Sequence, residues 1–278
     1  MPFVGLVLLR LQSHYLSLSP HWGLPVRYQV NEDDASNAGN ELSRRKQQGL
    51  RQLKGQNLLG GVVTLKILIL GAAGQIARML RNELINKTDH SIVLYARNGH
   101  KRLSINDENR EVILDGDFKD KDKLIDAMKD VDLVYINDMG DDKSTKTIID
   151  TMHDAGVRRV IAASVLGIYD EVPGAFGKWN KSMIGGSPRM QSQIDSAYLL
   201  ENCNLDYTLL RLTWLYNENG NTKYMITQKG EPFIGAQVTR QAVTQIIMDI
   251  IEEKSDKYLQ TSLGVSEPDT DWAKPSFY

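Results

Sequence analysis

The sequence predicts an α/β protein built on a doubly wound parallel sheet, and three observations lead to this prediction. Short apolar runs rich in β-branched residues recur along the chain and alternate with stretches of helical spacing. The first run, 66–70, has no charge after its opening lysine, as expected for a strand buried on both faces. A glycine-rich turn joins this run to the first helical stretch. Such alternation gives βαβ units with right-handed crossovers.

The turn after the first strand has the spacing G-x-x-G-x-x-A and predicts a dinucleotide-binding loop. Gly71 would form the tight turn, Gly74 would let the backbone approach a diphosphate, and the small Ala77 would let the helix pack closely. The free amides at the start of the helix would face the phosphates. The predicted cofactor-binding residues of this loop are Gly71, Ala72, Ala73, Gly74, Gln75 and Ile76.

The second strand, 90–96, decides which nicotinamide nucleotide is expected. Folds that prefer NAD carry an Asp or Glu near the end of this strand, where it binds the ribose 2′-hydroxyl. Here the strand ends in Arg97, with Lys101 and Arg102 just beyond. A guanidinium suits a 2′-phosphate, so NADP is expected in preference to NAD. A solvated basic turn is the alternative reading of the same residues.

The third strand, 111–114, leads into two candidates for the adenine site. Asp117 could accept a hydrogen bond from the adenine amino group, and Phe118 could pack beside the ring. Asp117 could also cap the helix that follows, and the two roles are compatible. The fourth strand, 131–136, ends at a loop expected to border the ribose and nicotinamide. That loop consists of Asn137, Asp138 and Met139.

The second half of the chain continues the alternation and adds a predicted substrate cap. A helix from about Ser144 to Gly156 precedes the fifth strand, 157–163, and the sixth strand is 206–212. A last helix is expected with Thr239 as its cap, before a closing strand at 257–265. Two turn-rich segments, at about 170–190 and 213–236, are predicted cap or lid elements.

Residues 1–64 differ in composition from the rest and form a separate region. The polar stretch 31–61 has few residues that could fill a core, so disorder is expected. An alternative expectation is that the natural protein starts at Leu65 and that the extension comes from a mistaken gene start. Under either expectation, residues 65–278 are predicted to form the nucleotide-binding domain.

Composition limits the partners and the compartment. The formal net charge is −2, which gives no indication of a nucleic-acid partner, and no apolar run is long enough to span a bilayer. The single cysteine, Cys203, excludes an internal disulfide and suits a reducing cytoplasm. A structural role is expected for it in preference to a catalytic one. No cluster has metal-ligand spacing.

Taken together, residues 65–278 resemble the atypical short-chain dehydrogenase/reductases, in particular their NAD(P)H-binding, NmrA-like branch. The resemblance rests on the glycine loop, the position of Arg97 and four further segments. These segments are 116–118, 157–164, 205–211 and 238–243. The resemblance implies a Rossmann-like doubly wound parallel sheet with a small C-terminal substrate cap. The branch includes NADPH-dependent reductases of flavins or quinones and regulators that bind the nucleotide without turnover, so the resemblance implies one of these two functions.

One departure from the superfamily bears on catalysis. Its enzymes use a Tyr-x-x-x-Lys pair for proton transfer, and no tyrosine here has a lysine four residues later. Hydride transfer to a flavin or quinone needs mainly orientation and a nearby proton donor. Ser164 matches a serine of flavin-reductase relatives and is the first catalytic candidate. Ser164 is also a predicted cofactor-binding residue. Tyr169 is the second catalytic candidate. A strand-end hydroxyl bonded to the backbone is the alternative for Ser164.

The leading hypothesis is therefore an NADPH-dependent oxidoreductase with a small planar acceptor. The rival hypothesis is a non-catalytic NADP(H) sensor acting through a protein partner or as a homodimer, and the missing Tyr-Lys pair is its motive. A nucleotide-sugar epimerase or dehydratase is a third, weaker alternative, because such enzymes normally require that pair.

Overall fold

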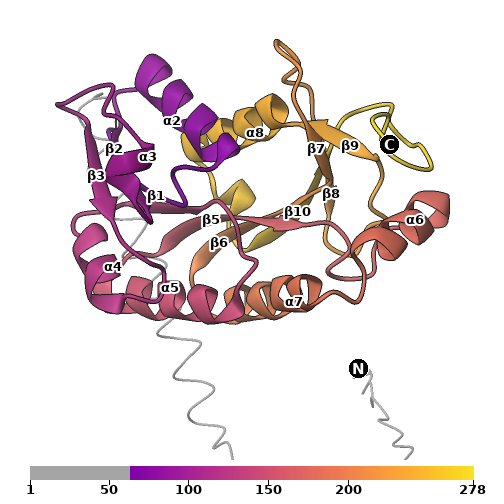
Figure 1. Ribbon diagram of the computed structural model, residues 1–278, viewed down its shortest axis with the longest axis horizontal. Coiled ribbons are helices and arrows are strands. Elements are labelled where there is room, and N and C mark those ends of the chain that lie inside the picture. The colour runs from indigo at the N-terminus through magenta and orange to yellow at the C-terminus, as the bar shows by residue number, and fades with distance from the viewer. Residues whose placement is uncertain (1–62) are drawn as a thin grey trace, which may run out of the picture. The chain divides into compact units, whose positions relative to one another are not determined.

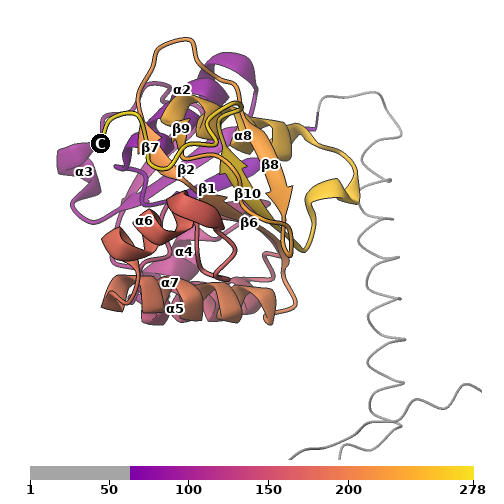
Figure 2. The ribbon, with the colours of Figure 1, turned by 90° about the vertical axis from the view of Figure 1, so that its right-hand side faces the viewer.

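The structure is a computed structural model that describes residues 63–278. Two expectations concern residues 1–64, namely that they are disordered or that they come from a mistaken gene start. Both therefore lie almost entirely outside the described residues. Within the described part, a central sheet lies between two layers of helices (Figure 1). Figure 2 shows the sheet with one helical layer above it and the other below it.

The main sheet of the described residues has the order β3-β2-β1-β4-β5-β6-β10-β8. All neighbouring strands are parallel except β10 and β8, which are antiparallel. Its strands are β1 (Lys66–Leu70), β2 (Ser91–Ala96), β3 (Glu111–Asp115), β4 (Leu133–Ile136), β5 (Arg159–Val165), β6 (Asp206–Leu212), β8 (Met225–Gln228) and β10 (Thr261–Ser266). The order reverses between β1 and β4, and open α/β sheets bind ligands beyond the carboxyl ends of the strands at this switch point.

Helices cover both faces of this sheet. One face carries α2 (Gln75–Lys87) and α8 (Arg240–Glu252), and the other carries α4 (Lys121–Ala127), α5 (Asp142–Ala155) and α7 (Pro188–Glu201). Alternate residues of β1 supply the two cores: Ile67 and Ile69 pack toward α2 and α8, while Leu68 and Leu70 pack toward the opposite layer. This doubly wound arrangement confirms the predicted fold class.

Two predicted helix ends are confirmed and one predicted cap is wrong. Gly156 ends α5 with a φ of 72°, and the Thr239 side chain accepts from the Ala242 amide at the start of α8. Asp117 does not cap α4, because the cap is Asp120, whose side chain accepts from the Lys123 amide. The Asp117 carboxylate accepts from a backbone amide of its own turn instead.

The segments predicted to form a cap take several different structures. Segment 170–190 contains α6 (Gly174–Ile184), and segment 213–236 contains both β7 (Trp214–Tyr216) and the edge strand β8 of the main sheet. β7 pairs in parallel with β9 (Gln237–Thr239) in a small second sheet. Two further short elements are α3 (Gly99–Arg102) and the 3-10 helix η2 (Asp256–Tyr258).

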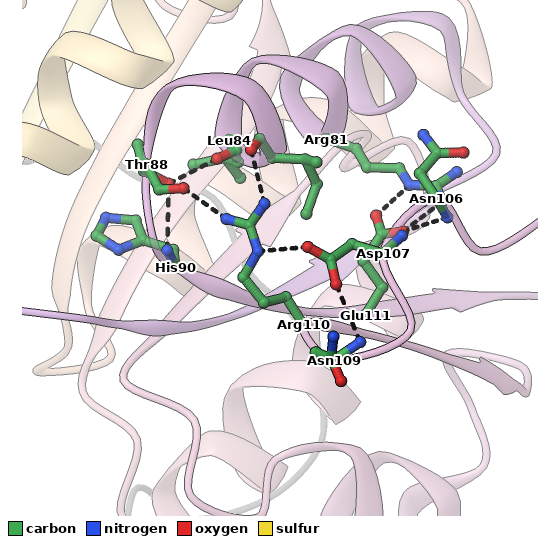
Figure 3. A network of polar contacts seen from close by, with 10 residues as sticks. Arg81, Leu84, Thr88, His90, Asn106, Asp107, Asn109, Arg110 and Glu111 are labelled. Carbon is green, nitrogen blue, oxygen red and sulfur yellow. Dashed lines mark hydrogen bonds and ion pairs between the residues drawn. The ribbon is translucent and has the colours of Figure 1, made fainter.

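A buried polar network fixes α2 against the outer strands (Figure 3). Arg81 of α2 forms an ion pair with Glu111 of β3, and their side chains are 5% and 0% exposed. Arg110 donates to the carbonyls of Ile85 and Thr88 at the end of α2, over 2.7 and 2.5 Å. These contacts hold the helix in place, so its N-terminus stays at the carboxyl end of β1.

The C-terminal tail joins α6 to the small sheet. The Tyr278 ring lies 5.2 Å from Trp179 of α6 and 5.0 Å from Trp214 of β7, centroid to centroid. The Ser276 amide and hydroxyl both donate to Oε1 of Gln237 in β9, over 2.9 and 2.8 Å. The last residues therefore hold together elements that border the carboxyl edge of the sheet (Figure 1).

Candidate functional site

The glycine loop, residues 71–74, crosses the carboxyl end of β2. Gly71 has a φ of 81°, in the left-handed region that favours glycine. Its amide and that of Ala72 both donate to the Tyr95 carbonyl, over 3.0 and 3.2 Å, and the Gly74 amide donates to the Gly71 carbonyl over 2.9 Å. The loop is thus a closed turn fixed to the neighbouring strand.

The start of α2 leaves backbone donors for a ligand. Gly74 is the N-cap residue, and no side chain caps the helix. The Arg78 amide makes the first bond back to the Gly74 carbonyl, so the amides of Gln75, Ile76 and Ala77 precede the helical ladder. A Cβ on Gly74 would collide with the Asn137 side-chain amide. This backbone fits a diphosphate, because its free donors and the helix dipole favour an anion.

A cavity of about 440 Å³ lies beside this loop. It is bounded by the start of α2, by the carboxyl ends of β4, β5 and β6, and by residues of α6, α7, β7 and α8. Its lining residues are Gln75, Ile76, Asn137, Asp138, Ala163, Ser164, Val165, Ile184, Ser187, Arg189, Met190, Gln193, Leu212, Thr213, Leu215 and Arg240. The lining is mixed: it includes polar side chains, among them Ser164, Arg189 and Arg240, and apolar side chains from β6, β7 and α6.

A chain of hydrogen bonds runs along one side of the cavity. The buried Ser164 hydroxyl donates to Oε1 of Gln193 over 2.8 Å, and Nε2 of Gln193 donates to Oδ1 of Asp138 over 3.2 Å. Arg189 donates to both carboxylate oxygens of Asp138, over 2.9 and 2.8 Å. A Cβ on Gly140 would collide with the Arg189 guanidinium, so the arginine lies against this glycine. The chain connects the end of β5 to α7 and to the loop after β4.

The predicted adenine side is formed by aromatic rings next to the glycine loop. Phe118 stacks on Tyr95 with ring centroids 6.0 Å apart, and the Tyr95 hydroxyl donates to the Asp117 carbonyl over 2.8 Å. Burial, followed by the charges of Asp120 and Asp117, raises the pKa of Tyr95, so its hydroxyl stays protonated and keeps this bond. The turn that carries Asp117 is therefore fixed to β2.

Three arginines are linked to one another and to the loop through backbone carbonyls, on the side predicted for the ribose. The side chain of Arg97 is 76% exposed and lies 3.8 Å from the Asp117 carboxylate. Arg102 donates to the Arg97 carbonyl over 3.3 Å. Arg78 donates to the carbonyls of Ala73 and Arg102, over 3.1 and 2.6 Å, and so connects the glycine loop to the basic turn. We call Arg78, Arg97 and Arg102 the arginine cluster.

The structure brings most, though not all, of the predicted residues together. Five of them line the cavity: Gln75, Ile76, Asn137, Asp138 and Ser164. The glycine loop and Phe118 adjoin them, since a Cβ on Gly71 would contact both Asn137 and Phe118. Met139 is only 1% exposed and packs in the hydrophobic core, outside the cavity lining.

Tyr169 lies away from the cavity and apart from Ser164. Its hydroxyl donates to Glu201 over 2.6 Å and also lies 3.0 Å from the Ser262 hydroxyl. Burial and the bond to Glu201 raise its pKa. The Lys229 ammonium lies 4.5 Å from the centre of the ring. This geometry gives the predicted catalytic role of Tyr169 no support.

Sequence reasoning missed several polar residues of the site, among them Arg78, Arg189, Gln193 and Arg240. Arg189 and Gln193 lie four residues apart on α7, and this spacing puts them on one helix face. That spacing could have indicated them. Arg240 directly follows the predicted cap Thr239, where a cation is unexpected.

Two structural findings bear on other kinds of site. Within residues 63–278, no group of three or more histidine, cysteine or acidic side chains is placed to hold a metal ion. Across the same residues, no helix combines the length and the apolar character needed to cross a bilayer.

Comparison with known proteins relates the chain to nucleotide-binding proteins. Residues 71–254 match the family model described as NAD(P)H-binding. A short-chain dehydrogenase/reductase (ethylated) from Veillonella parvula is 36% identical, with a TM-score of 0.75 over 78% of this chain and 100% of that chain. No curated protein matches.

Two further solved structures support the same relation. A short-chain dehydrogenase/reductase (wide type) from the same species, solved in complex with NADP, is 36% identical, with a TM-score of 0.74 over 77% of this chain and 99% of that one. A Rossmann-fold NAD(P)-binding family protein from Shigella flexneri is 32% identical, with a TM-score of 0.63 over the same shares.

Proposed function

The chain belongs to the NAD(P)H-binding family, as an oxidoreductase of the atypical short-chain dehydrogenase/reductase type, and we propose that it reduces a small planar acceptor, a flavin or quinone, with NADPH. One observation carries this proposal. One cavity is lined by the start of α2, by apolar residues of β6 and β7, and by Ser164. A nucleotide and a flat apolar partner could therefore meet at one hydroxyl.

The residues for the cofactor follow from the loop geometry. The amides of Gln75 and Ile76 would bind the diphosphate, and the ring of Phe118 would pack near the adenine. The arginine cluster would bind the 2′-phosphate, because guanidinium groups form paired, charge-assisted bonds to phosphate. NADP in complex with the Veillonella parvula protein is consistent with this preference.

The reaction needs little from the protein beyond orientation. When bound, NADPH would supply a hydride to one ring atom of the acceptor, and a proton from solvent would complete the reduction on another ring atom. Ser164 would donate a hydrogen bond to the acceptor atom on which negative charge develops by turning its single hydroxyl hydrogen from Gln193 to that atom, and this would stabilise the transition state. The side chain of Gln193 holds the hydroxyl in place beforehand. Apolar residues such as Leu212 and Leu215 limit access of water and support the flat face of the acceptor.

A direct assay tests this proposal. The purified full chain is mixed with NADPH and a panel of flavins and quinones, and the loss of reduced-nicotinamide absorbance is followed. Turnover of at least one acceptor is expected, and Ser164→Ala should lower kcat by roughly 100-fold. Ser104→Ala, which changes an exposed serine remote from the cavity lining, is the matched control and should retain full activity.

The rival function, a nucleotide sensor without turnover, gives a different result in the same experiment. Its motive is the missing Tyr-Lys pair, together with the engagement of the Ser164 hydroxyl by Gln193. Tight NADPH binding with no oxidation in the presence of any acceptor would overturn the reductase proposal and favour the sensor. No binding of either nicotinamide nucleotide would overturn both.

A further inference from the structure

The cavity holds one cation that has no carboxylate partner. Of its lining residues, Arg189 and Arg240 are basic and Asp138 is acidic. Asp138 already accepts two bonds from Arg189. Arg240 has a different environment: its guanidinium donates to the amide oxygen of Asn217 over 3.2 Å, and among the described residues no carboxylate pairs with it.

The position of Arg240 opposes two general rules of protein electrostatics. The residue is partly buried, and burial lowers the pKa of its guanidinium with no compensating negative charge. A guanidinium keeps its proton in proteins, so this cost is not relieved by neutralisation. Arg240 is also the first residue of α8, where the helix dipole favours anions, and the first turn of α8 contains no acid. Both costs would be offset by an anion in the cavity.

The side of the cavity from which Arg240 projects indicates which ligand carries that anion. Arg240 follows β9, which pairs with β7 in the register Leu215 to Val238. Arg240 thus directly follows a strand of the small sheet that contains Leu215, whereas the glycine loop follows a strand of the main sheet. Leu215 is part of the wall that faces a flat acceptor in the proposed reaction. An acidic group on that acceptor would reach Arg240 while its ring lay against the wall.

We propose that Arg240 binds an acidic group, a phosphate or carboxylate, of the electron acceptor, so that the substrates are acidic planar molecules. This inference rests on the proposed function and narrows its substrate class. Arg240 acts as a specificity residue: it holds the acceptor by its acid, and Ser164 and the apolar wall receive the ring.

Matched pairs of acceptors test the inference. FMN and riboflavin share one ring system and differ by a phosphate, and 1,2-naphthoquinone and its 4-sulfonate form a second pair. Arg240→Gln should raise KM for the acidic member roughly 10- to 100-fold, because it removes a charge-assisted hydrogen bond. The neutral member should change by less than about twofold, and Arg240→Lys should retain most of the preference. Lys254→Gln removes one positive charge just after the other end of α8 and is the control.

The outcomes separate this inference from its premise. Equal KM changes for acidic and neutral acceptors in Arg240→Gln would overturn the inference and leave the reductase proposal standing. Calorimetry would also overturn the inference if Arg240→Gln lost as much affinity for NADPH as for FMN. That result would assign Arg240 to the cofactor diphosphate. If no acceptor is reduced, the premise fails. In that case, flavin fluorescence with NADP present measures the dissociation constants of FMN and riboflavin. These constants still decide whether Arg240 selects an acidic ligand. Equal dissociation constants for the two flavins, or no binding of FMN, would refute the inference.

Discussion

Replacing Glu111 with glutamine should destabilise the protein strongly, although the side chain keeps its shape. The Glu111 carboxylate accepts from the Arg81 guanidinium through both oxygens, and Oε2 also accepts from the amides of Asn106 and Asp107, over 2.6 and 3.0 Å (Figure 3). Glutamine removes the negative charge and turns one acceptor into an N–H donor that faces other donors. Arg81 would remain buried without a counter-charge.

The size of the effect follows from the burial of this pair. Breaking a buried ion pair by removing one partner costs about 3–5 kcal/mol. For a domain of this length, 1 kcal/mol shifts the melting temperature by about 2–4 °C. Glu111→Gln should therefore lower Tm by roughly 6–20 °C at neutral pH.

The pH dependence supplies an independent check. Burial alone would raise the pKa of Glu111, but the bonds from Arg81 and the two amides outweigh it and lower the pKa below its ordinary value. A carboxyl group with a lowered folded-state pKa contributes stability above its unfolded pKa, and that contribution is lost as pH falls through the folded-state pKa. The difference between wild type and variant should stay constant above about pH 5 and shrink below about pH 4.

Chemical and thermal unfolding at neutral and acid pH measures both effects. The control is Glu83→Gln, which makes the same substitution but breaks an i,i+4 pair with Lys87 whose side chains are 36% and 60% exposed. Surface pairs contribute about 0–1 kcal/mol, so the control should unfold close to wild type. The reasoning is refuted if Glu111→Gln is as mild as the control, or if its deficit is the same at acid pH.

Three further outcomes are expected. Arg97→Glu should weaken NADPH binding roughly tenfold or more and NADH binding far less, as measured by calorimetry; equal losses would remove the 2′-phosphate role. Gly74→Ala should fold normally, since its φ of −70° suits alanine, yet lose NADPH affinity because the new methyl group displaces the Asn137 amide; unchanged affinity would argue against a diphosphate at this loop. Deleting Phe277 and Tyr278 should lower Tm by several degrees, since each aromatic pair contributes about 0.5–1.5 kcal/mol. The deletion should also alter tryptophan fluorescence, because the Tyr278 ring lies against Trp179. An unchanged Tm and spectrum would show that the tail does not hold α6.

The body of the fold could be predicted because its signals are local. The run 66–70 is apolar at every position after Lys66, and the stripe Ile76, Leu80 and Leu84 has helical spacing. The cap Thr239 and the glycine at 156 act within one turn of the chain, so the residue types alone indicate them. Strand β8 has no such signal: four residues with a partly polar sequence become a strand only because β10 offers its free edge.

The direction of Tyr169 shows why a correct strand can still mislead about a side chain. β5 ends on the ligand side of the sheet, as predicted, but Gly167 adopts a φ of 85° and turns the chain. The Glu171 carboxylate then accepts from the amides of Gly167 and Tyr169, over 3.1 and 2.9 Å. This turn directs the ring into the core beneath the sheet, and its hydroxyl meets Glu201 from α7. Strand order predicts where the backbone goes, whereas this turn decides where the ring points.

The polar chain in the cavity could not be read from the sequence, because its partners are far apart along it. Ser164 and Gln193 are separated by 29 residues, and Asp138 and Arg189 by 51. No local pattern relates a serine after one strand to a glutamine on a helix. Such pairs follow from the packing of α7 against the sheet, and only the three-dimensional structure reveals them.

The absence of the Tyr-Lys pair and the presence of this polar chain favour the same class of acceptor. A simple carbonyl that takes up hydride becomes an alkoxide and needs a strong, well-placed acid, which the usual tyrosine supplies. A flavin or quinone spreads the new charge over its ring system, so a neutral hydrogen-bond donor is sufficient. Ser164 becomes such a donor when its single hydroxyl hydrogen turns from Gln193 to the acceptor, and the amide of Gln193 cannot itself act as an acid. A cavity with this donor therefore suits reduction of a delocalised acceptor better than reduction of an isolated ketone.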